Sequence, residues 1–179
     1  MIESAAVDVA EDFDAVARLY RPKIFRFALA CLRDRDAAET IAQDCLLKAY
    51  LAVHRFRGEC SLQTWLMQIA VNLIRDYTRN QRLRFWRRME QRGRMEGFEN
   101  WLIDERDPEA LTSSKQQVRT IWKAAHSLPP KQKMVFLLRF VEDMDLLEIA
   151  AVTGMKEGTV KTHLFRSVRR IRERLAGPV

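Results

Sequence analysis

The stretch that decides the fold is GMKEGTVKTHLFRSVRRIRERL, residues 154–175. When each residue advances about 100° around a helix, the apolar side chains of this stretch gather on one narrow stripe. The stripe is made by Val160, Leu164, Val168, Ile171 and Leu175. A short helical pattern over 145–152 precedes it, and Asp145 and Glu148 have the spacing of a capping box. Because Gly154 stands where a helix end favours positive φ, this order predicts a helix-turn-helix whose apolar stripe faces a core.

The face opposite this stripe predicts contact with DNA. It carries Thr162, Phe165, Arg166 and Arg169, with Lys161 at its edge. A basic helix face is most often simply solvated. Phe165 argues against that reading, because an aromatic side chain beside an arginine suits thymine methyl groups and guanine edges in a major groove. We therefore expect this helix to enter the major groove of DNA.

The remainder of the chain also follows the helical period, without sustained period-2 alternation, so we expect an all-α fold. Residues 1–82 predict an N-terminal bundle of amphipathic helices. The expected helices cover about 11–32, 36–53 and 62–77. We expect Pro22 to break or kink the first helix, Asp36 and Glu39 to form a capping box, and Ser61 to cap the third helix.

Residues 114–179 predict a C-terminal domain of four helices that ends in the helix-turn-helix. The expected helices cover about 114–126, 131–141, 145–152 and 156–175. Between the two domains, 83–113 contains a basic run followed by an acidic run, with glycines and a proline among them. This composition predicts a charged linker, although the two runs could also pair with each other and fold.

Composition limits the function classes. The net charge is +7, and residues 119–179 hold 12 basic and 6 acidic side chains, so most of the excess lies in the last third. Such an excess is typical of a polyanionic partner. The acidic N-terminus lacks the apolar core of a signal peptide, and the longest apolar run, 27–32, is too short to cross a bilayer. We expect a cytoplasmic protein without membrane insertion.

Nothing in the sequence points to catalysis. We find no glycine-rich phosphate loop, no His or Cys cluster with metal spacing, and no Ser-His-Asp pattern. The three cysteines, at 31, 45 and 60, are odd in number and form no C-x-x-C pair, so reduced cytosolic thiols are expected. The three histidines, at 54, 126 and 163, are scattered, as structural or surface histidines are. We expect no catalytic residue, no metal site and no cofactor.

Two segments resemble one family. SLPPKQKMVFLLRFVEDMDLLEIAAVTGMKEGTVKTHLFRSVRRIRERL, residues 127–175, resembles region 4 of the extracytoplasmic-function sigma factors of bacterial RNA polymerase. AAETIAQDCLLKAY stands where region 2 of that family has an acidic D-A-E-D-L-V-Q-E segment. FRGECSLQTWLMQIAVNLIRDYTRNQR stands where region 2 has its F-R-G loop and the following helix. The resemblance covers roughly 13–81 and 127–175 and implies a non-enzymatic factor for promoter-specific transcription initiation.

A free-standing helix-turn-helix regulator is the alternative that the C-terminal part alone would fit. A response regulator should show βα alternation with buried carboxylates, and a dimeric repressor should show a heptad seam. The sequence shows neither pattern. The sigma-factor reading is therefore favoured.

In the family, region 4 places its last helix in the major groove of the −35 element. The resemblance implies that base reading here falls to Lys161, Thr162, Phe165 and Arg166. It gives Arg169 and Arg170 phosphate contacts, which position a helix without reading sequence.

Region 2 of the family recognises and melts the −10 element, and a flipped base enters a pocket beside the F-R-G loop. The resemblance implies a pocket formed by Phe56, Arg57, Gly58, Glu59, Cys60, Ser61 and Asn72. An aromatic wall and edge-bonding groups suit a flipped base, although Phe56 and Trp65 could both be core aromatics. Arg75 and Arg79 lie on the polar side of the helix that carries Asn72 and could follow the phosphate backbone.

The resemblance also implies protein partners. The helix over 36–53 resembles the one that docks on the β′ clamp of core RNA polymerase, with Gln43, Asp44, Leu47 and Lys48 facing the clamp. The β flap and an anti-sigma factor are further partners that it suggests, beside promoter DNA. Promoter elements about 17 base pairs apart are separated by roughly 55–60 Å. A linker of some 35 residues stretches to about 110–120 Å, which covers that separation.

Overall fold

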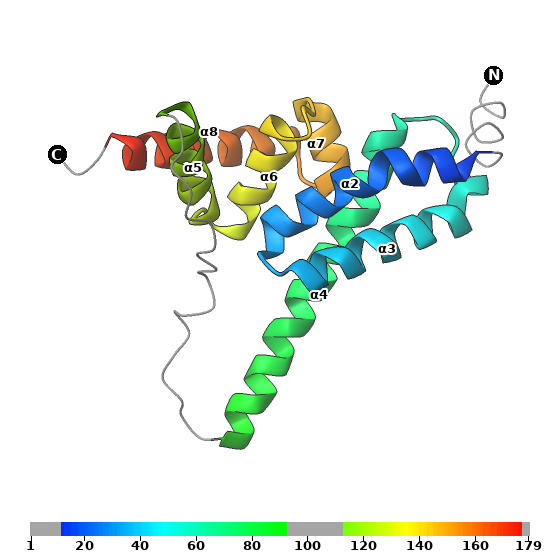
Figure 1. The fold of residues 1–179 in the computed structure, drawn as a ribbon, viewed down its shortest axis with the longest axis horizontal. Coiled ribbons are helices and arrows are strands. Elements are labelled where there is room, and N and C mark those ends of the chain that lie inside the picture. Colours follow the sequence, from blue (N-terminus) through cyan, green and yellow to red (C-terminus); the bar gives the residue numbers. More distant parts are fainter. Residues whose placement is uncertain (1–11, 93–112, 177–179) are drawn as a thin grey trace.

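The computed structural model describes residues 12–92 and 113–176, and within these ranges the chain is helical and contains no strand (Figure 1). The all-α prediction is therefore confirmed. The helices are α2 (Phe13–Leu32), α3 (Arg35–Ala52), the 3-10 turn η1 (Val53–Arg55), α4 (Leu62–Arg92), α5 (Ser113–His126), α6 (Pro130–Phe140), α7 (Leu146–Thr153) and α8 (Glu157–Leu175).

Local sequence signals set most of these helix ends. The Ser61 hydroxyl accepts a hydrogen bond from the backbone N–H of Thr64 at 3.1 Å, so the expected cap of α4 is confirmed. The capping box of α7 is confirmed as well: Asp145 Oδ1 accepts from the N–H of Glu148, and Glu148 Oε2 accepts from the N–H of Asp145. Gly154 ends α7 in the left-handed conformation, with φ 65°.

Two local predictions fail. The expected capping box at Asp36 and Glu39 is wrong, because α3 begins earlier and Asp34 caps it by accepting from the N–H of Ala37 at 2.9 Å. Glu39 instead pairs with Arg21 of the neighbouring helix α2. Of the two outcomes expected at Pro22, the break is wrong, since α2 continues through this residue, and the kink stays a prediction.

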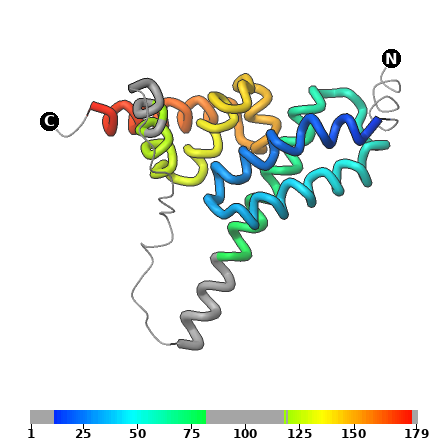
Figure 2. The backbone as a smooth tube through the Cα atoms, in the orientation of Figure 1, coloured from blue at the N-terminus to red at the C-terminus, as the bar shows by residue number. Residues whose placement is uncertain are grey.

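The helices form two groups that lie side by side. α2 and α3 are antiparallel neighbours that pack against the first half of α4, and α6 packs with α7 and α8 (Figure 2). α5 packs against the C-terminal end of α8 through a small cluster made by Ala124, Ala125, Leu128 and Ile171. Helices that are close in the chain are thus also neighbours in space: α2–α4 form one group and α5–α8 the other.

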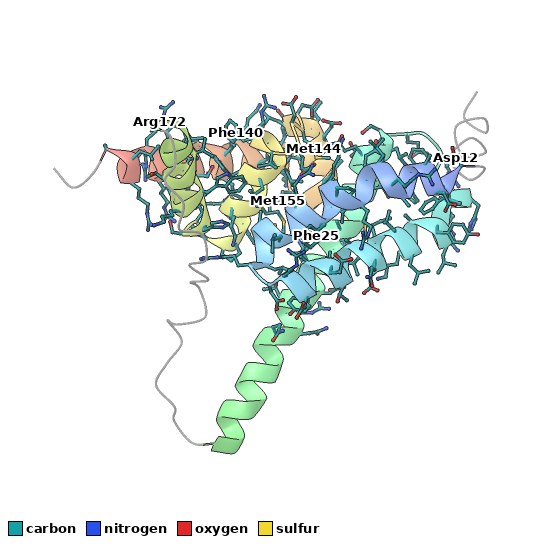
Figure 3. The ribbon with its side chains drawn as sticks, in the orientation of Figure 1. Asp12, Phe25, Phe140, Met144, Met155 and Arg172 are labelled. Atoms are coloured by element: carbon teal, nitrogen blue, oxygen red, sulfur yellow. The ribbon has the colours of Figure 1, made fainter. Side chains whose placement is uncertain are left out.

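One apolar core joins the two groups. Its members include Phe27 of α2 and Leu66 of α4 as well as Leu138 of α6 and Ile149 of α7. Buried Met144 belongs to the same core, and Phe25 and Met155 pack against it from opposite groups (Figure 3). The N-terminal and C-terminal helices therefore fold against each other rather than apart.

Between the described residues of the two groups, four side-chain hydrogen bonds cross this contact. Gln63 Nε2 donates to the carbonyl of Glu142 at 2.8 Å, and Thr64 Oγ1 donates to Glu148 Oε1 at 3.0 Å. The other two are donated by Arg75 to the Thr153 carbonyl at 2.6 Å and by Lys133 Nζ to the Cys31 carbonyl at 2.8 Å. Since burial lowers the pKa of Lys133, this last contact holds an ammonium group in a partly dehydrated site.

α4 is longer than the sequence indicates. The apolar period fades near Leu83, yet the helix continues to Arg92. The first ten residues of the predicted linker are therefore helical, and residues 93–112 lie outside the described part of the chain. No helix in the described ranges is both long enough and apolar enough to span a bilayer.

Candidate nucleic-acid interface

The α7–turn–α8 unit presents a rigid helix face to solvent. Val160 and Ile171 are buried, and Leu164 and Val168 are half-buried, so the apolar stripe of α8 faces the core as the sequence predicts. Leu175 is the exception, because it lies at the last residue of α8 and is exposed. The packing of the other four side chains fixes the rotation of α8 and turns its opposite face outward.

All six residues expected to contact the −35 element lie on the outward part of α8. They are Lys161, Thr162, Phe165, Arg166, Arg169 and Arg170, and each is exposed. Phe165 is 68% exposed although nearby apolar residues of α8 are covered. With Thr162 and Arg166 beside it, this exposed ring gives the face groups that suit thymine methyl groups and guanine edges.

The cations of this face differ in their partners. Lys161 pairs with Glu157 at 2.6 Å, and Arg169 pairs with Glu173 at 3.4 Å, one helical turn away in each case. Within the described ranges, Arg166 and Arg170 have no such ion pair. Exposed pairs of this kind stabilise a helix by about 0.3–0.5 kcal/mol, so Lys161 and Arg169 can exchange their carboxylate for a phosphate or a base edge at small cost.

Thr162 and His163 have defined hydrogen-bonding capacity. The Thr162 hydroxyl donates its only proton to the carbonyl of Gly158 at 2.8 Å, so toward a ligand it offers lone pairs and a methyl group. Burial, followed by the nearby charges of Lys131 and Arg166, lowers the pKa of His163. His163 is therefore neutral at neutral pH, and Arg166 and Arg170 remain the cations without an acidic partner in this part of the helix.

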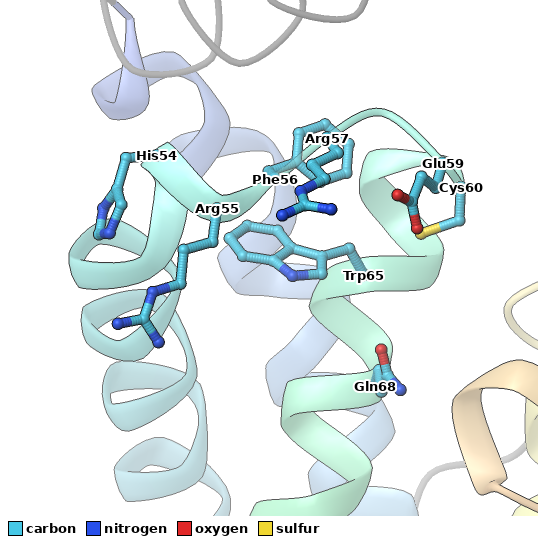
Figure 4. Close-up of a pocket in the computed structure, with 8 residues that line it drawn as sticks. All are labelled: His54, Arg55, Phe56, Arg57, Glu59, Cys60, Trp65 and Gln68. Atoms are coloured by element: carbon cyan, nitrogen blue, oxygen red, sulfur yellow. The ribbon is translucent and has the colours of Figure 1, made fainter.

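The second candidate surface lies where the F-R-G loop leads into α4. A cavity of about 570 Å³ opens there, and its walls come from η1, the loop and the first turns of α4 (Figure 4). It is lined by His54, Arg55, Phe56, Arg57, Glu59, Cys60, Trp65 and Gln68. The cavity combines an aromatic wall with cationic and amide groups, which is the chemistry that an unstacked base requires.

The structure brings only part of the predicted base pocket into this cavity. Phe56, Arg57, Glu59 and Cys60 line it, whereas Ser61 serves as the cap of α4 and Gly58 shapes the loop with φ 69°. Asn72 does not reach the cavity. It lines a separate space of about 260 Å³ between α3 and α4, together with Lys48 and Asp76.

Phe56 and Trp65 have different positions at the cavity, which the sequence alone could not distinguish. Phe56 is 6% exposed and its ring packs against Trp65 with centroids 5.1 Å apart and ring planes tilted by 36°, so Phe56 belongs mainly to the packing beneath the cavity. Trp65 is half-buried and borders both cavities. Sequence reasoning missed four lining residues: His54, Arg55, Trp65 and Gln68. Gln68 follows Trp65 by three positions and so shares its helix face.

The two arginines expected to follow the phosphate backbone have protein partners. Arg75 donates to the carbonyl of Thr153 at the end of α7. Arg79 pairs with Asp76 at 3.0 Å on the same helix. Both side chains are exposed, so each keeps access to solvent on one side.

The outer face of α3 forms a third exposed surface. Gln43, Asp44, Leu47 and Lys48 are all exposed, as a docking face requires. Leu47 is 57% exposed, and Leu51, one turn further on the same face, is 64% exposed. The sequence analysis missed Leu51, which the i, i+4 spacing from Leu47 could have identified.

Comparison with known proteins gives matches over both halves of the chain. Residues 16–84 match the family model for Sigma-70 region 2, and residues 119–171 match the model for Sigma-70, region 4. The chain is 29% identical over 166 residues to the ECF RNA polymerase sigma factor SigW of Bacillus subtilis, a match that covers 91% of this chain and 88% of SigW. It is also 29% identical over 157 residues to the ECF RNA polymerase sigma-E factor of Escherichia coli, covering 87% and 82% of the two chains.

Solved structures show the same fold. The sigma factor RpoE of Bartonella quintana, crystallised with the anti-sigma factor NepR, has a TM-score of 0.68 at 22% identity, over 94% of this chain and 99% of RpoE. CnrH, solved with the cytosolic domain of CnrY, has a TM-score of 0.66 at 16% identity, over 99% of each chain.

Proposed function

The chain belongs to the extracytoplasmic-function group of the sigma-70 family, and from this premise we propose a role for each of its exposed surfaces. As a sigma factor it serves promoter-specific transcription initiation by RNA polymerase. We assign residues 1–82 to region 2, 83–113 to the linker and 114–179 to region 4. A free-standing regulator is set aside, because regions 2 and 4 match in one chain and in the order of the family.

Region 4 reads the −35 element through α8. The single observation that carries this proposal is the outward face of α8, on which Phe165, Thr162 and Arg166 stand exposed above a packed stripe. Arg166 suits a guanine edge, and the Phe165 ring and Thr162 methyl suit thymine methyl groups. Arg169 and Arg170 lie further along the helix and hold phosphates, which set the position of α8.

Region 2 recognises and melts the −10 element with the cavity at the start of α4. The cavity takes one unpaired base of the non-template strand, with the tilted pair of Phe56 and Trp65 as its apolar wall. Arg55, Arg57 and Gln68 supply donors for the base edge or its phosphates. Asn72 lies in the neighbouring space and contacts the adjoining nucleotide.

The α3 face docks on the β′ clamp of core polymerase, and region 4 meets the β flap. Gln43, Asp44 and Lys48 offer polar contacts around the exposed Leu47, and such an apolar residue with a polar rim is typical of an interface. Bartonella RpoE and CnrH were solved with NepR and CnrY. On that precedent, an anti-sigma factor is a further partner of this chain.

Promoter binding changes the contact between the two halves. Arg75 directs one of its guanidinium N–H groups to the Thr153 carbonyl of α7, so a −10 phosphate competes with this hydrogen bond for the side chain. The α4–α7 contact therefore opens when region 2 binds the −10 strand, and the hydrogen bonds of Gln63 and Thr64 to α7 are released with it.

Reconstitution with core RNA polymerase tests these roles. The purified chain and core enzyme select promoter fragments from a randomised library, and the selected fragments are transcribed with and without the chain. We expect two conserved elements about 17 base pairs apart, and start sites that depend on the chain. Selection of a single element, or transcription that is equal without the chain, would contradict the proposal.

A further inference from the structure

Gly158 begins the outward face of α8. It lies in the first turn of the helix, four residues before Thr162, and the i, i+4 and i+7 spacing continues to Thr162 and Phe165. Gly158 is exposed, and its carbonyl accepts the hydroxyl proton of Thr162. The residue thus lies on the same stripe as the proposed base readers, one turn nearer the N-terminus of α8.

Nothing within the described part of the protein requires a glycine at this position. A Cβ built on Gly158 meets no heavy atom within 4 Å, so a side chain would have room. Of the two glycines in the helix-turn-helix, Gly154 has a left-handed φ and Gly158 does not. Gly154 is explained by the turn that it makes, whereas Gly158 is explained by neither backbone geometry nor packing.

Glycine at this place has a cost. Among helix residues glycine is a poorer choice than alanine, because it loses more conformational freedom on folding. A surface position in a helix with free space around it would therefore gain stability from almost any ordinary side chain. The absence of a side chain at Gly158 therefore suggests that a binding partner occupies this space.

We propose that Gly158 is a positioning residue for promoter reading: its bare backbone lets the first turn of α8 approach the base edges closely enough for Thr162, Phe165 and Arg166 to reach them. The inference rests on the proposed −35 role of region 4. In helix-turn-helix proteins the N-terminal residues of the second helix come closest to the bases, and Gly158 occupies that part of α8. A side chain there would hold the helix away from the groove floor and weaken every contact along the stripe.

The test compares Gly158→Ala and Gly158→Leu with the wild type in two measurements. Thermal unfolding of the full chain reports on stability, and we expect Gly158→Ala to raise the melting temperature by about 1–3 °C. Binding is measured with reconstituted holoenzyme on duplexes selected from a random library by the wild-type holoenzyme. For these duplexes we expect Gly158→Ala to lose about tenfold in affinity and Gly158→Leu to lose more, as overfilled interfaces do.

Two controls separate the possible results. Gly154→Ala is the matched variant, because it adds the same methyl group at a residue with φ 65° and should lower stability. Duplexes with a scrambled −35 element form the second control, and on them the Gly158 variants should bind as the wild type does. Unchanged affinity of Gly158→Ala for the selected duplexes would overturn the inference, and so would a fall in its melting temperature.

Failure of the −35 role itself gives a different pattern. In that case the wild-type holoenzyme would not distinguish intact from scrambled −35 duplexes, and Arg166→Ala would bind like the wild type. If the wild type does distinguish them and Arg166→Ala is impaired, the −35 role stands, and the affinity of Gly158→Ala then decides the inference alone.

Discussion

The two surfaces that we propose to contact DNA differ in how much of each is assembled in the free chain. The reading face of α8 is complete, because one packed helix carries every side chain and the core fixes its rotation. The region 2 surface is incomplete, because Phe56 is buried, Asn72 lines another space and Arg75 bonds to Thr153. Duplex DNA presents its base edges already ordered, so a preformed helix suffices, whereas an unpaired base must be received by groups that move toward it.

The two phenylalanines give the strongest test of this difference. Phe56→Ala removes a buried ring, and we expect it to lower the free energy of unfolding by about 3–5 kcal/mol. Phe165→Ala removes an exposed ring, and we expect a change within about 0.5 kcal/mol, together with weaker −35 binding. Urea unfolding and binding of holoenzyme to selected promoter fragments measure the two effects. A stable Phe56→Ala variant that fails only in melting DNA would show that Phe56 acts directly on the base.

Arg166 and Arg170 test whether the face of α8 both reads and positions. Arg166→Ala should reduce discrimination at one −35 position by about 1–3 kcal/mol. Arg170→Ala should weaken binding evenly across sequences and reduce the slope of log K against log salt by about 0.9. Holoenzyme binding to a set of single-base −35 variants at three salt concentrations gives both values. Equal loss on every sequence with Arg166→Ala would make that residue a phosphate contact.

Arg75 tests whether the α4–α7 contact must open before region 2 can bind the −10 strand. Arg75→Ala removes a hydrogen bond across the α4–α7 contact, worth about 0.5–1.5 kcal/mol net, so the contact should open two- to tenfold more often. Alkylation of Cys31 reports this opening, because the Cys31 carbonyl accepts a hydrogen bond from Lys133 of α6, and the charges of Lys133 and of Glu142, which follows α6, act on its thiol. Burial raises the pKa of both Cys31 and Cys45 to about 12.

Cys45 is therefore the internal control: its thiol pKa is similar, and it is buried where its thiol donates to the Leu66 carbonyl of α4, whereas Cys31 is half-buried. We expect Arg75→Ala to speed the alkylation of Cys31 without changing that of Cys45. Addition of core polymerase to the wild type should have the same selective effect. Equal acceleration at both cysteines would indicate general loosening of the fold instead.

The smallest expected effect comes from His126, the last residue of α5. Burial, then the charges of Arg33 and Lys133, lower its pKa to about 4. The unfolded chain, with a histidine pKa near 6.5, binds this proton more readily than the folded chain. Stability from this group is therefore complete above about pH 6.5 and falls as the pH decreases toward 4.

Urea unfolding at pH 7 and pH 5, for the wild type and His126→Gln, isolates this contribution. The wild type should lose more stability between the two values than the variant does. The comparison with the variant is needed because burial raises the pKa of Glu142, which makes an opposing contribution. An identical pH dependence for both proteins would mean that His126 is already solvated in solution.

Sequence reasoning succeeded where a feature depends on neighbours along the helix. The outward face of α8 follows from 100° per residue, and the α7 capping box follows from the spacing of Asp145 and Glu148. It failed where a closer competitor existed: Asp34 precedes Asp36 and caps α3 first. It could not place Arg75 or Asn72, because their partners are set by packing between helices about 80 residues apart or by the space between α3 and α4.

The uninterrupted course of α4 sets the geometry of the tether between the two halves. A helix rises 1.5 Å per residue, so residues 83–92 span about 15 Å where an extended chain would span about 33 Å. Residues 93–112 add at most about 70 Å. The greatest separation is then about 85 Å, against about 103 Å if residues 83–92 were extended, and it still exceeds the roughly 55–60 Å between promoter elements. Under the proposed promoter role, shortening residues 93–112 by more than about eight positions would remove this margin. The helical length of residues 83–92 and the number of residues in 93–112 would then together limit the spacer length that the protein accepts.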